Sequence, residues 1–338
     1  MDLRAPGDGR STTGGERIAR ALWHVAPGRA ELSSGALAPP GDGDALARTL
    51  YSAISRGTER LVFNGGVPES EYAAMRAPMQ DGDFPFPVKY GYCAVARVEE
   101  GPRDLVGRII FALHPHQDLF VAPAAFVAPV PEHIPAERAV LAANMETALN
   151  ALWDSGAGPG DRIAIFGGGA VGLLIAFLAA QTPGAEVTLI DPDVSRTSIA
   201  QSFGARFSSE PDAVHDADLV FHASASAAGL SAALAACGNE ARLVEMSWYG
   251  DRAVAAPLGG AFHAKRLQIV SSQVGQVSPS RRPRWSHARR IAKALDLLAD
   301  ARLDRLLSER VAFTRLPDEL PRLLAPGAPG VVPLVVYD

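Results

Sequence analysis

The chain has 338 residues, of which 48% are hydrophobic and 20% charged, with 32 Lys and Arg against 37 Asp and Glu. This composition is typical of a globular protein of about two domains, and it excludes a disordered chain, a coiled coil and a collagen-like repeat. A net charge of −5 argues against a general nucleic-acid or anionic-membrane binder. The two cysteines, Cys93 and Cys237, form neither a disulfide framework nor a cysteine-rich zinc site, and this usage fits the cytoplasm.

The first half of the chain contains few regular helix signals. Residues 1–16 are polar and glycine-rich, so we expect a flexible leader there and no secretion signal. Up to about residue 146, short apolar runs alternate with proline and glycine, which is typical of a compact, irregular β domain.

From residue 147 to 280 the pattern alternates between strands and helices. Strands are expected at 161–166, 186–191, 218–222, 241–246 and 266–272. Helices are expected at 170–180, 195–203 and 227–236. This alternation predicts an α/β domain with a parallel sheet and right-handed crossovers. A helix at 286–299 and a strand at 331–338 are expected to follow.

One uncharged run, residues 163–180, has nearly the length of a membrane span. Three adjacent glycines, Gly167 to Gly169, interrupt it. A strand, a glycine turn and a buried helix explain the run better, and we predict no membrane span.

The same glycines form the strongest motif of the chain. Gly167, Gly169 and Gly172 fit the pattern G-x-G-x-x-G, with Ala170 and Val171 between the last two. A strand ends before the motif and an apolar helix begins within it, which is the context that dinucleotide binding requires. Gly167 permits the tight turn, Gly169 the approach of a pyrophosphate to the helix N-terminus, and Gly172 close packing of helix and strand.

An acidic residue follows at the expected distance. Asp191 ends the second strand, roughly 20 residues after the glycines, where it would accept hydrogen bonds from the adenosine ribose. Because a carboxylate repels a 2′-phosphate, the sequence favours NAD over NADP. Arg196 is close enough in sequence to leave NADP open.

Several segments resemble the medium-chain dehydrogenase/reductase superfamily, which includes the zinc alcohol dehydrogenases. Besides the glycine motif, they are YSAISRGTE (51–59), VKYGYCAVARVEE (88–100) and LAANMETALNAL (141–152). The resemblance implies a Rossmann domain at 147–280 and a GroES-like catalytic domain formed by 17–146 and 281–338. SRGTE also resembles the bacteriochlorophyllide hydroxyethyl dehydrogenase branch, which acts on a larger cyclic substrate.

The zinc ligands of that family are missing. The family places a Cys in the first segment, a His in the second and a Cys or Glu in the third. This chain has Ser55 or Arg56, then Lys89, then Ala143 or Asn144. Since none of these is a usual zinc ligand, we predict that no catalytic zinc is bound.

Without zinc, another group has to stabilise the substrate oxygen and move a proton, because hydride transfer itself belongs to the nicotinamide. Lys89 is a candidate for polarising a carbonyl, with Tyr90 as proton donor; a solvated lysine and a packing tyrosine are the alternatives. Thr58 and Glu59 resemble the hydroxyl–acid pair of the family's proton relay, or else form an exposed turn.

Glu146 and the residues around it are further candidates. Glu146 either orients a donor and acts as the acid, or is an ordinary helix-surface glutamate. Thr147 resembles a residue that touches the nicotinamide. His116, close to His114, is a candidate acid–base group, although loop histidines are usually solvated.

Polar and aromatic residues follow two strands of the α/β domain, at the edge where cofactors bind. His222, Ser224 and Ser247 are therefore expected to contact the cofactor. Trp248 and Tyr249 are expected to wall the nicotinamide or substrate pocket, with packing at a turn as the alternative.

A basic cluster lies further on, at Arg281, Arg282, Arg284, Arg289 and Arg290. It either holds an anionic substrate or, as we favour, is a solvated linker and helix start.

These features predict a zinc-independent, NAD(P)-dependent dehydrogenase that interconverts a secondary alcohol and a ketone. A zinc-free enoyl or quinone reductase is the second hypothesis, and a catalytically inactive cofactor-binding sensor or scaffold is the third. The expected partner is a small-molecule substrate, and the resemblance implies a homodimer paired near residues 266–272.

Overall fold

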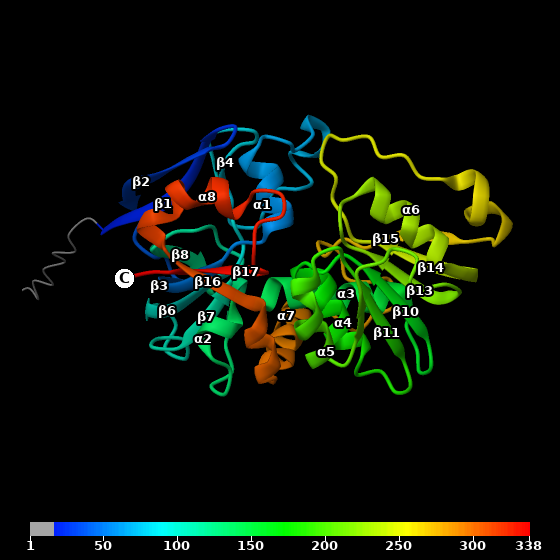
Figure 1. Ribbon diagram of the computed structural model, residues 1–338. Helices are drawn as coiled ribbons and strands as arrows, with labels where there is room; N and C mark the ends of the chain where they lie inside the picture. The colour runs from blue at the N-terminus through cyan, green and yellow to red at the C-terminus, as the bar shows by residue number, and fades with distance from the viewer. Residues whose placement is uncertain (1–16) are drawn as a thin grey trace, which may run out of the picture.

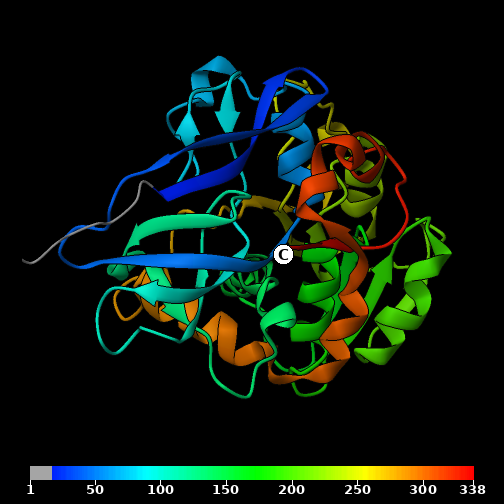
Figure 2. The same ribbon diagram turned by 90° about the vertical axis from the view of Figure 1, so that its left-hand side faces the viewer.

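The computed structural model describes residues 17–338, so the leader expected at residues 1–16 lies outside the described residues. Two lobes lie side by side, one built mainly from the first half of the chain and one from its middle (Figure 1). The C-terminus returns to the first lobe (Figures 1 and 2). The domain limits suggested by the sequence remain a prediction.

The first lobe is rich in β structure, as the many turn signals predict. Its strands are β1 (Arg17–Ala26), β2 (Arg29–Leu37), β3 (Asp44–Ala53), β4 (Asp81–Gly82), β5 (Val88–Lys89), β6 (Ala94–Glu100), β7 (Ile109–Ala112), β8 (Leu119–Pro123) and β9 (Val127–Pro129). Its helices are α1 (Arg56–Phe63) and the short α2 (Ala136–Ala139). One sheet has the order β2-β1-β5-β4, and another runs from β3 through β6 and β7 to β9.

The last part of the chain completes the first lobe. It contains β16 (Leu307–Ala312), α8 (Leu316–Leu323) and β17 (Val332–Val336). Strand β17 pairs parallel with β16 and antiparallel with β3, opposite Ser52 and Ala53. The final strand is thus inserted between β16 and β3, and α8, which precedes it in the chain, lies on the upper side of this lobe (Figure 1).

The second lobe is a parallel sheet with helices on both faces, the architecture that the alternating pattern predicts. Its strands are β10 (Arg162–Phe166), β11 (Glu186–Ile190), β12 (Arg206–Ser208), β13 (Ala217–His222), β14 (Cys237–Glu245) and β15 (Gln268–Ser271). Its helices are α3 (Ala142–Ser155), α4 (Ala170–Ala179), α5 (Thr197–Ser202), α6 (Ala227–Ala236) and α7 (His287–Asp296). The order β12-β11-β10-β13-β14-β15 is that of a Rossmann fold, which confirms the predicted fold class.

Side-chain alternation along β10 explains why both faces are covered. Ile163 and Ile165 belong to the core shared with α3 and α4, whereas Ala164 and Phe166 pack in the core beneath α6. The strand is buried on both faces and therefore reads as a continuous apolar run. Helix α4 is apolar all round, with Leu173 to Ala179 buried, so the membrane-length run is a buried strand and helix. Across residues 17–338, no helix has the length and hydropathy needed to cross a membrane.

Candidate active site

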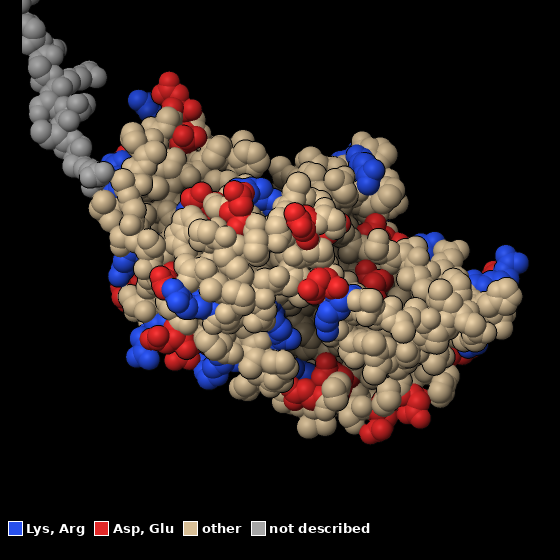
Figure 3. Space-filling model, turned by 90° about the horizontal axis from the view of Figure 1, so that it is seen from above, with Lys and Arg blue, Asp and Glu red and all other residues tan. Residues whose placement is uncertain are grey.

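A cavity of about 1700 Å³ opens between the two lobes, and residues of both lobes line it. Figure 3 shows the hollow from above, with blue and red side chains around its mouth. The structure brings many of the predicted site residues to this cavity. They are Thr58, Tyr90, Glu146, Thr147, Gly167, Gly169, Ala170, Val171, Asp191, Arg196, Ser224, Ser247 and Trp248.

The glycine turn between β10 and α4 has no room for side chains at two positions. Gly167 has φ +113, and a Cβ there would lie 2.8 Å from the carbonyl carbon of Ala223. A Cβ on Gly172 would lie 1.9 Å from the carbonyl oxygen of Gly167. Turn and helix therefore pack together only because both residues are glycine.

Gly169 has a different role from its neighbours. A Cβ built on it would meet nothing within 4 Å, so the space above it is open to the cavity. Gly169 is the N-cap of α4 and no side chain caps this helix, so the first N–H groups, at Ala170 and Val171, are left free for a ligand. An open cradle, free N–H donors and the positive end of a helix fit the pyrophosphate of a dinucleotide.

Asp191 stands directly beside the glycine turn. Its carboxylate accepts hydrogen bonds from the N–H groups of Gly168 and Asp193. Arg196 forms an ion pair with Asp193 at 3.0 Å and donates to the carbonyl of Gly330 at 2.9 Å. One acid and one guanidinium thus flank the place where the adenosine ribose would bind.

Gly330 also connects this place to the other lobe. Arg56, on α1, donates to the same carbonyl oxygen at 2.7 Å. Burial lowers the pKa of the Arg56 guanidinium, and the nearby Arg196 lowers it further. Two arginines from opposite lobes therefore converge on one carbonyl at the edge of the cavity.

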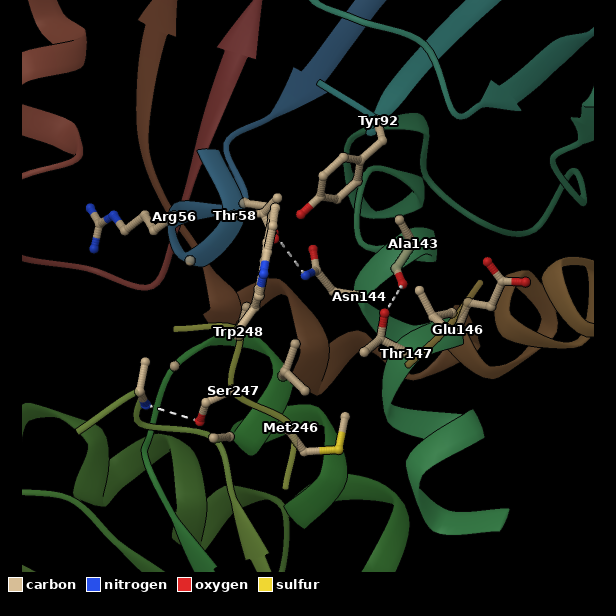
Figure 4. A pocket seen from close by; sticks show the side chains of 18 of the residues that line it. Arg56, Thr58, Tyr92, Ala143, Asn144, Glu146, Thr147, Met246, Ser247 and Trp248 are labelled. Carbon is tan, nitrogen blue, oxygen red and sulfur yellow. Dashed lines mark hydrogen bonds between the residues drawn. The ribbon is translucent and has the colours of Figure 1, made fainter. Parts of the chain in front are cut away.

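Deeper in the cavity, Ser55, Tyr92 and Asn144 form a polar trio. Asn144 Nδ2 donates to Ser55 Oγ at 3.2 Å, and Tyr92 lines the same part of the cavity. The Tyr92 hydroxyl and the Asn144 amide point toward the same space (Figure 4). Burial raises the pKa of the Tyr92 phenol well above its usual value, so the group keeps its proton at neutral pH.

The donor set of this trio does not suit zinc. A neutral hydroxyl, phenol and amide offer none of the thiolate, imidazole or carboxylate ligands that bind zinc in proteins. Within residues 17–338, no three or more His, Cys, Asp or Glu side chains gather in a way that could hold a metal ion.

Glu59 and His116 do not line the cavity but are buried behind it. Glu59 accepts a hydrogen bond from the Ser55 N–H at 2.7 Å and lies 3.1 Å from His116 Nε2. His116 Nδ1 is 2.7 Å from the hydroxyl of Ser52, which is 2.9 Å from the Tyr337 hydroxyl. These residues therefore hold the trio from behind rather than reach a substrate.

Lys89 is turned away from the cavity. Its ammonium donates to Gln117 at 2.8 Å and pairs with Asp81 at 3.2 Å, and the residue is not part of the lining. The next residue, Tyr90, does line the cavity but is 3% exposed. Tyr92, two residues further on, lines the cavity together with Ser55 and Asn144.

Glu146 and Thr147 lie on α3, at the border of the two lobes. The Glu146 carboxylate turns away from the trio, and burial raises its pKa although Arg290 opposes this (Figure 4). The Thr147 hydroxyl donates to the carbonyl of Ala143 at 2.9 Å. Arg290 is 1% exposed, so the expectation that it belongs to a solvated basic linker is wrong, whereas Arg281 and Arg289 are exposed.

The residues after β13 and β14 lie next to one another. His222 is fully buried and is hydrogen-bonded to Ser224, while Tyr249 stacks on its ring. His222 and Tyr249 do not line the cavity, but His222 is hydrogen-bonded to Ser224 and Ser247, which do. Trp248 lies across from Tyr92 (Figure 4).

A Rossmann sheet with a glycine turn, joined to a β-rich lobe, is the architecture of this chain, and comparisons with solved structures show which proteins share it. L-idonate 5-dehydrogenase of Escherichia coli superposes with a TM-score of 0.78 at 13% identity, over 96% of this chain and 99% of that one. A protein of Sinorhizobium meliloti described as a zinc-binding dehydrogenase, bound to NADP, gives 0.76 at 18%, over 95% and 100%. A protein of Escherichia coli CFT073 described as a short chain alcohol dehydrogenase, complexed with NADH, gives 0.74 at 15%, over 96% and 100%. The chain therefore has the fold of these dehydrogenases.

Sequence comparison adds a local match. Geraniol dehydrogenase of Castellaniella defragrans is 44% identical over 70 residues, which are 20% of this chain and 18% of that protein. The chain thus aligns with less than a fifth of that relative. No protein-family model matches the chain.

Proposed function

We propose that the protein is an NAD(P)-dependent alcohol dehydrogenase or ketone reductase that works without zinc. The observation that carries the proposal is the polar trio of Ser55, Tyr92 and Asn144, which lies in the same cavity as the glycine turn. Dehydrogenases with this fold and bound NADP or NADH support the cofactor class.

The chain's own residues have distinct roles in this proposal. The N–H groups of Ala170 and Val171 donate hydrogen bonds to the pyrophosphate. Asp191 accepts hydrogen bonds from the ribose, and its carboxylate favours NAD over NADP. When bound, the nicotinamide supplies or accepts the hydride. Thr147, Ser247 and Trp248 border the space that remains for it.

Tyr92 replaces the metal as the group that handles the substrate oxygen. A protonated phenol donates a hydrogen bond to a carbonyl and stabilises the negative charge that develops as hydride arrives. The raised pKa of Tyr92 keeps that proton available for transfer to the new alcohol. Asn144 is hydrogen-bonded to Ser55 beside the phenol, and Glu59 in turn holds Ser55 through its N–H.

The substrate side of the cavity is apolar. Met75, Met79, Phe126 and Leu61 line it, and Phe126 is 64% exposed. Such a lining supports a bulky, cyclic or otherwise apolar alcohol better than a small polar one.

The proposal also includes a homodimer in the cytoplasm. Strand β15 is the edge of its sheet and exposes Ile269, which supports pairing with a second copy. Cys93 and Cys237 are buried free thiols, as expected in a reducing compartment. Light scattering of the purified protein tests the dimer.

The decisive experiment is a titration of metal-stripped protein with NADH and NADPH, followed by nicotinamide fluorescence. We expect saturable binding without metal, tighter for NADH, and turnover of secondary alcohols or ketones that zinc does not increase. Binding that requires zinc would refute zinc independence. Turnover of activated C=C bonds alone would identify an enoyl or quinone reductase, and binding without any turnover would identify a sensor.

A further inference from the structure

Three side chains at the carboxyl ends of β13 and β14 form a continuous hydrogen-bonded row. Ser224 Oγ lies 2.7 Å from His222 Nε2, and His222 Nδ1 lies 2.8 Å from the nearer oxygen of Glu245. In this order the His222 Nδ1–H donates a hydrogen bond to Glu245, which leaves the Nε2 lone pair free to take the proton of Ser224. A serine, a histidine and an acid in this order activate the serine hydroxyl as a nucleophile.

The burial of the three groups suits that chemistry. His222 is 0% exposed, whereas Ser224 is exposed and lines the cavity. Burial tends to raise the pKa of Glu245, but hydrogen bonds from His222 and Ser247 outweigh it and hold the pKa below its usual value. The Tyr249 hydroxyl donates to the same carboxylate at 3.2 Å. The acid is therefore ionised and fixed, and the serine is accessible.

The backbone around Ser224 is shaped to fit the row. Ser224 lies in the turn between β13 and α6, and the next residue, Ala225, has φ +52, which L residues rarely adopt. A Cβ on Gly229 would lie 2.4 Å from Ser224 Oγ and 3.0 Å from His222 Nε2. The glycine thus lets the helix approach the serine–histidine pair. The first N–H groups of α6, at Ala227 and Ala228, have no partner within the helix.

We propose that Ser224 is the nucleophile of a second site, which hydrolyses small activated acyl esters in the nucleotide-free cleft. Ser224 Oγ forms a bond to the acyl carbon as the bond from that carbon to the leaving oxygen breaks. His222 takes the serine proton and gives it to the leaving alkoxide. A water molecule then attacks the acyl-serine, passes its proton through His222 back to Ser224, and releases the acid. The sum is ester plus water to acid plus alcohol.

This activity goes beyond the proposed dehydrogenase. The two activities use the same cavity and therefore cannot take place at the same moment. Ser224 and the glycine turn line the same cavity, and Gly167 packs against the backbone of residues 223 and 224. A dinucleotide bound at the glycine turn would cover Ser224, so we expect NADH to protect the serine from acylation.

The test uses the full-length protein free of nucleotide, p-nitrophenyl acetate as substrate and a fluorophosphonate as serine-directed label. The variants are Ser224→Ala and His222→Gln, with Ser231→Ala as control because Ser231 lies on α6 but not on the cavity. We expect Ser224→Ala and His222→Gln to lower the hydrolysis rate about a hundredfold, and Ser231→Ala to leave it unchanged. Peptide mapping of the labelled parent protein should place the phosphonate on Ser224, and NADH should slow the labelling.

Equal hydrolysis by the parent and Ser224→Ala, or label on other residues only, would overturn the proposal. His222 is buried, so His222→Gln counts only if it unfolds at the temperature of the parent; the labelled serine decides the matter independently. A fluorescence titration of each variant with NADH reports on the dinucleotide site separately. Esterase activity without NADH binding refutes the proposed dehydrogenase alone, and the reverse result refutes the esterase alone.

Discussion

The guanidinium of Arg290 and the carboxylate of Glu146 form a buried ion pair between α7 and α3, with 2.9 Å between Nε and Oε1. Arg290 also donates to Asn150 at 2.7 Å and to the carbonyls of Val274 and Gln276. The pair therefore fixes the loop that follows β15, part of which lines the cavity. One long side chain holds together three segments that are distant in the sequence.

Replacing Arg290 by Met should destabilise the protein by about 3–5 kcal/mol, because it leaves Glu146 charged and buried without a partner. Chemical denaturation measures the change. The double variant Arg290→Met with Glu146→Leu should recover much of the loss. Lys293→Met, at an exposed position of the same helix, serves as control and should change stability little. A harmless Arg290→Met would show that the pair contributes nothing.

Removing the phenol hydroxyl with Tyr92→Phe should lower kcat by about a hundredfold or more and leave NADH binding intact, because only the proton donor is lost. Steady-state kinetics and fluorescence titration separate the two effects. Tyr72→Phe is the matched control, since Tyr72 packs on Phe84 outside the cavity lining. An undiminished kcat in Tyr92→Phe would assign the proton to another residue.

Two alanine substitutions in the glycine turn should have opposite signatures. Gly169→Ala should preserve the melting temperature and weaken NADH binding, because its methyl group enters the open cradle. Gly172→Ala should cost more than about 2 kcal/mol of folding free energy, because its methyl group collides with the Gly167 carbonyl. Thermal melts and NADH titrations of both variants form the measurement. Unimpaired binding by Gly169→Ala would place the pyrophosphate elsewhere.

Charge beside the ribose should control the choice of cofactor. Asp191→Ser should shift the NADH-to-NADPH affinity ratio toward NADPH by about tenfold or more, since it removes the carboxylate that repels a 2′-phosphate. Arg196→Ala should weaken NADPH more than NADH. Both ratios come from fluorescence titrations. A ratio that Asp191→Ser leaves unchanged would mean that Asp191 serves only the glycine turn.

His24 should make the fold sensitive to acid. Neither ring nitrogen has a hydrogen-bond partner among residues 17–338, and burial lowers its pKa to about 4, against the opposing effect of Glu59. Between pH 6.5, the ordinary pKa, and pH 4, the unfolded chain binds a proton that the native state refuses. Stability should therefore fall as the pH drops through this window, by on the order of 3 kcal/mol in total.

The variant His24→Leu tests this origin of the acid sensitivity. It should flatten the loss of stability between pH 6.5 and 4 while leaving the neutral value nearly unchanged. Denaturation curves across that range give the answer. His114, whose pKa burial lowers to about 3, continues to titrate in the variant and sets the remaining slope. An identical slope in the variant would assign the effect to other groups.

The sequence predicts the second lobe well because its signals are local. The helix expected at 227–236 has those bounds in α6, and the strand expected at 161–166 is β10 within one residue. Helix α1 was not expected, because its eight residues are too short to show a helical period among the turn signals around it. Strand β14 begins at Cys237, before its apolar run. Its start is set by the pairing of Cys237 with Ala217 of β13, which the local sequence pattern does not contain.

In the candidate site, local sequence patterns do not predict which side chains reach the cavity or become buried. In the segment VKYGY, the sequence predicts Lys89 as the residue that polarises the substrate carbonyl. The chain turns at Gly91, with φ +132, and Tyr92 rather than Lys89 lines the cavity. Arg290 looks like one more charge in a basic run. Its burial depends on Glu146 and Asn150, about 140 residues away in the chain, and no local pattern contains that contact.

The position of β17 has a consequence for synthesis of the chain on the ribosome. The strand pairs with β3, and Tyr337 is hydrogen-bonded to Ser52, a contact that spans 285 residues. The first lobe cannot close its sheet until these late residues emerge, whereas every strand of the second lobe, β10 to β15, has already been made. The nucleotide-binding lobe is therefore able to fold first, and the lobe that starts the chain is the last to be finished.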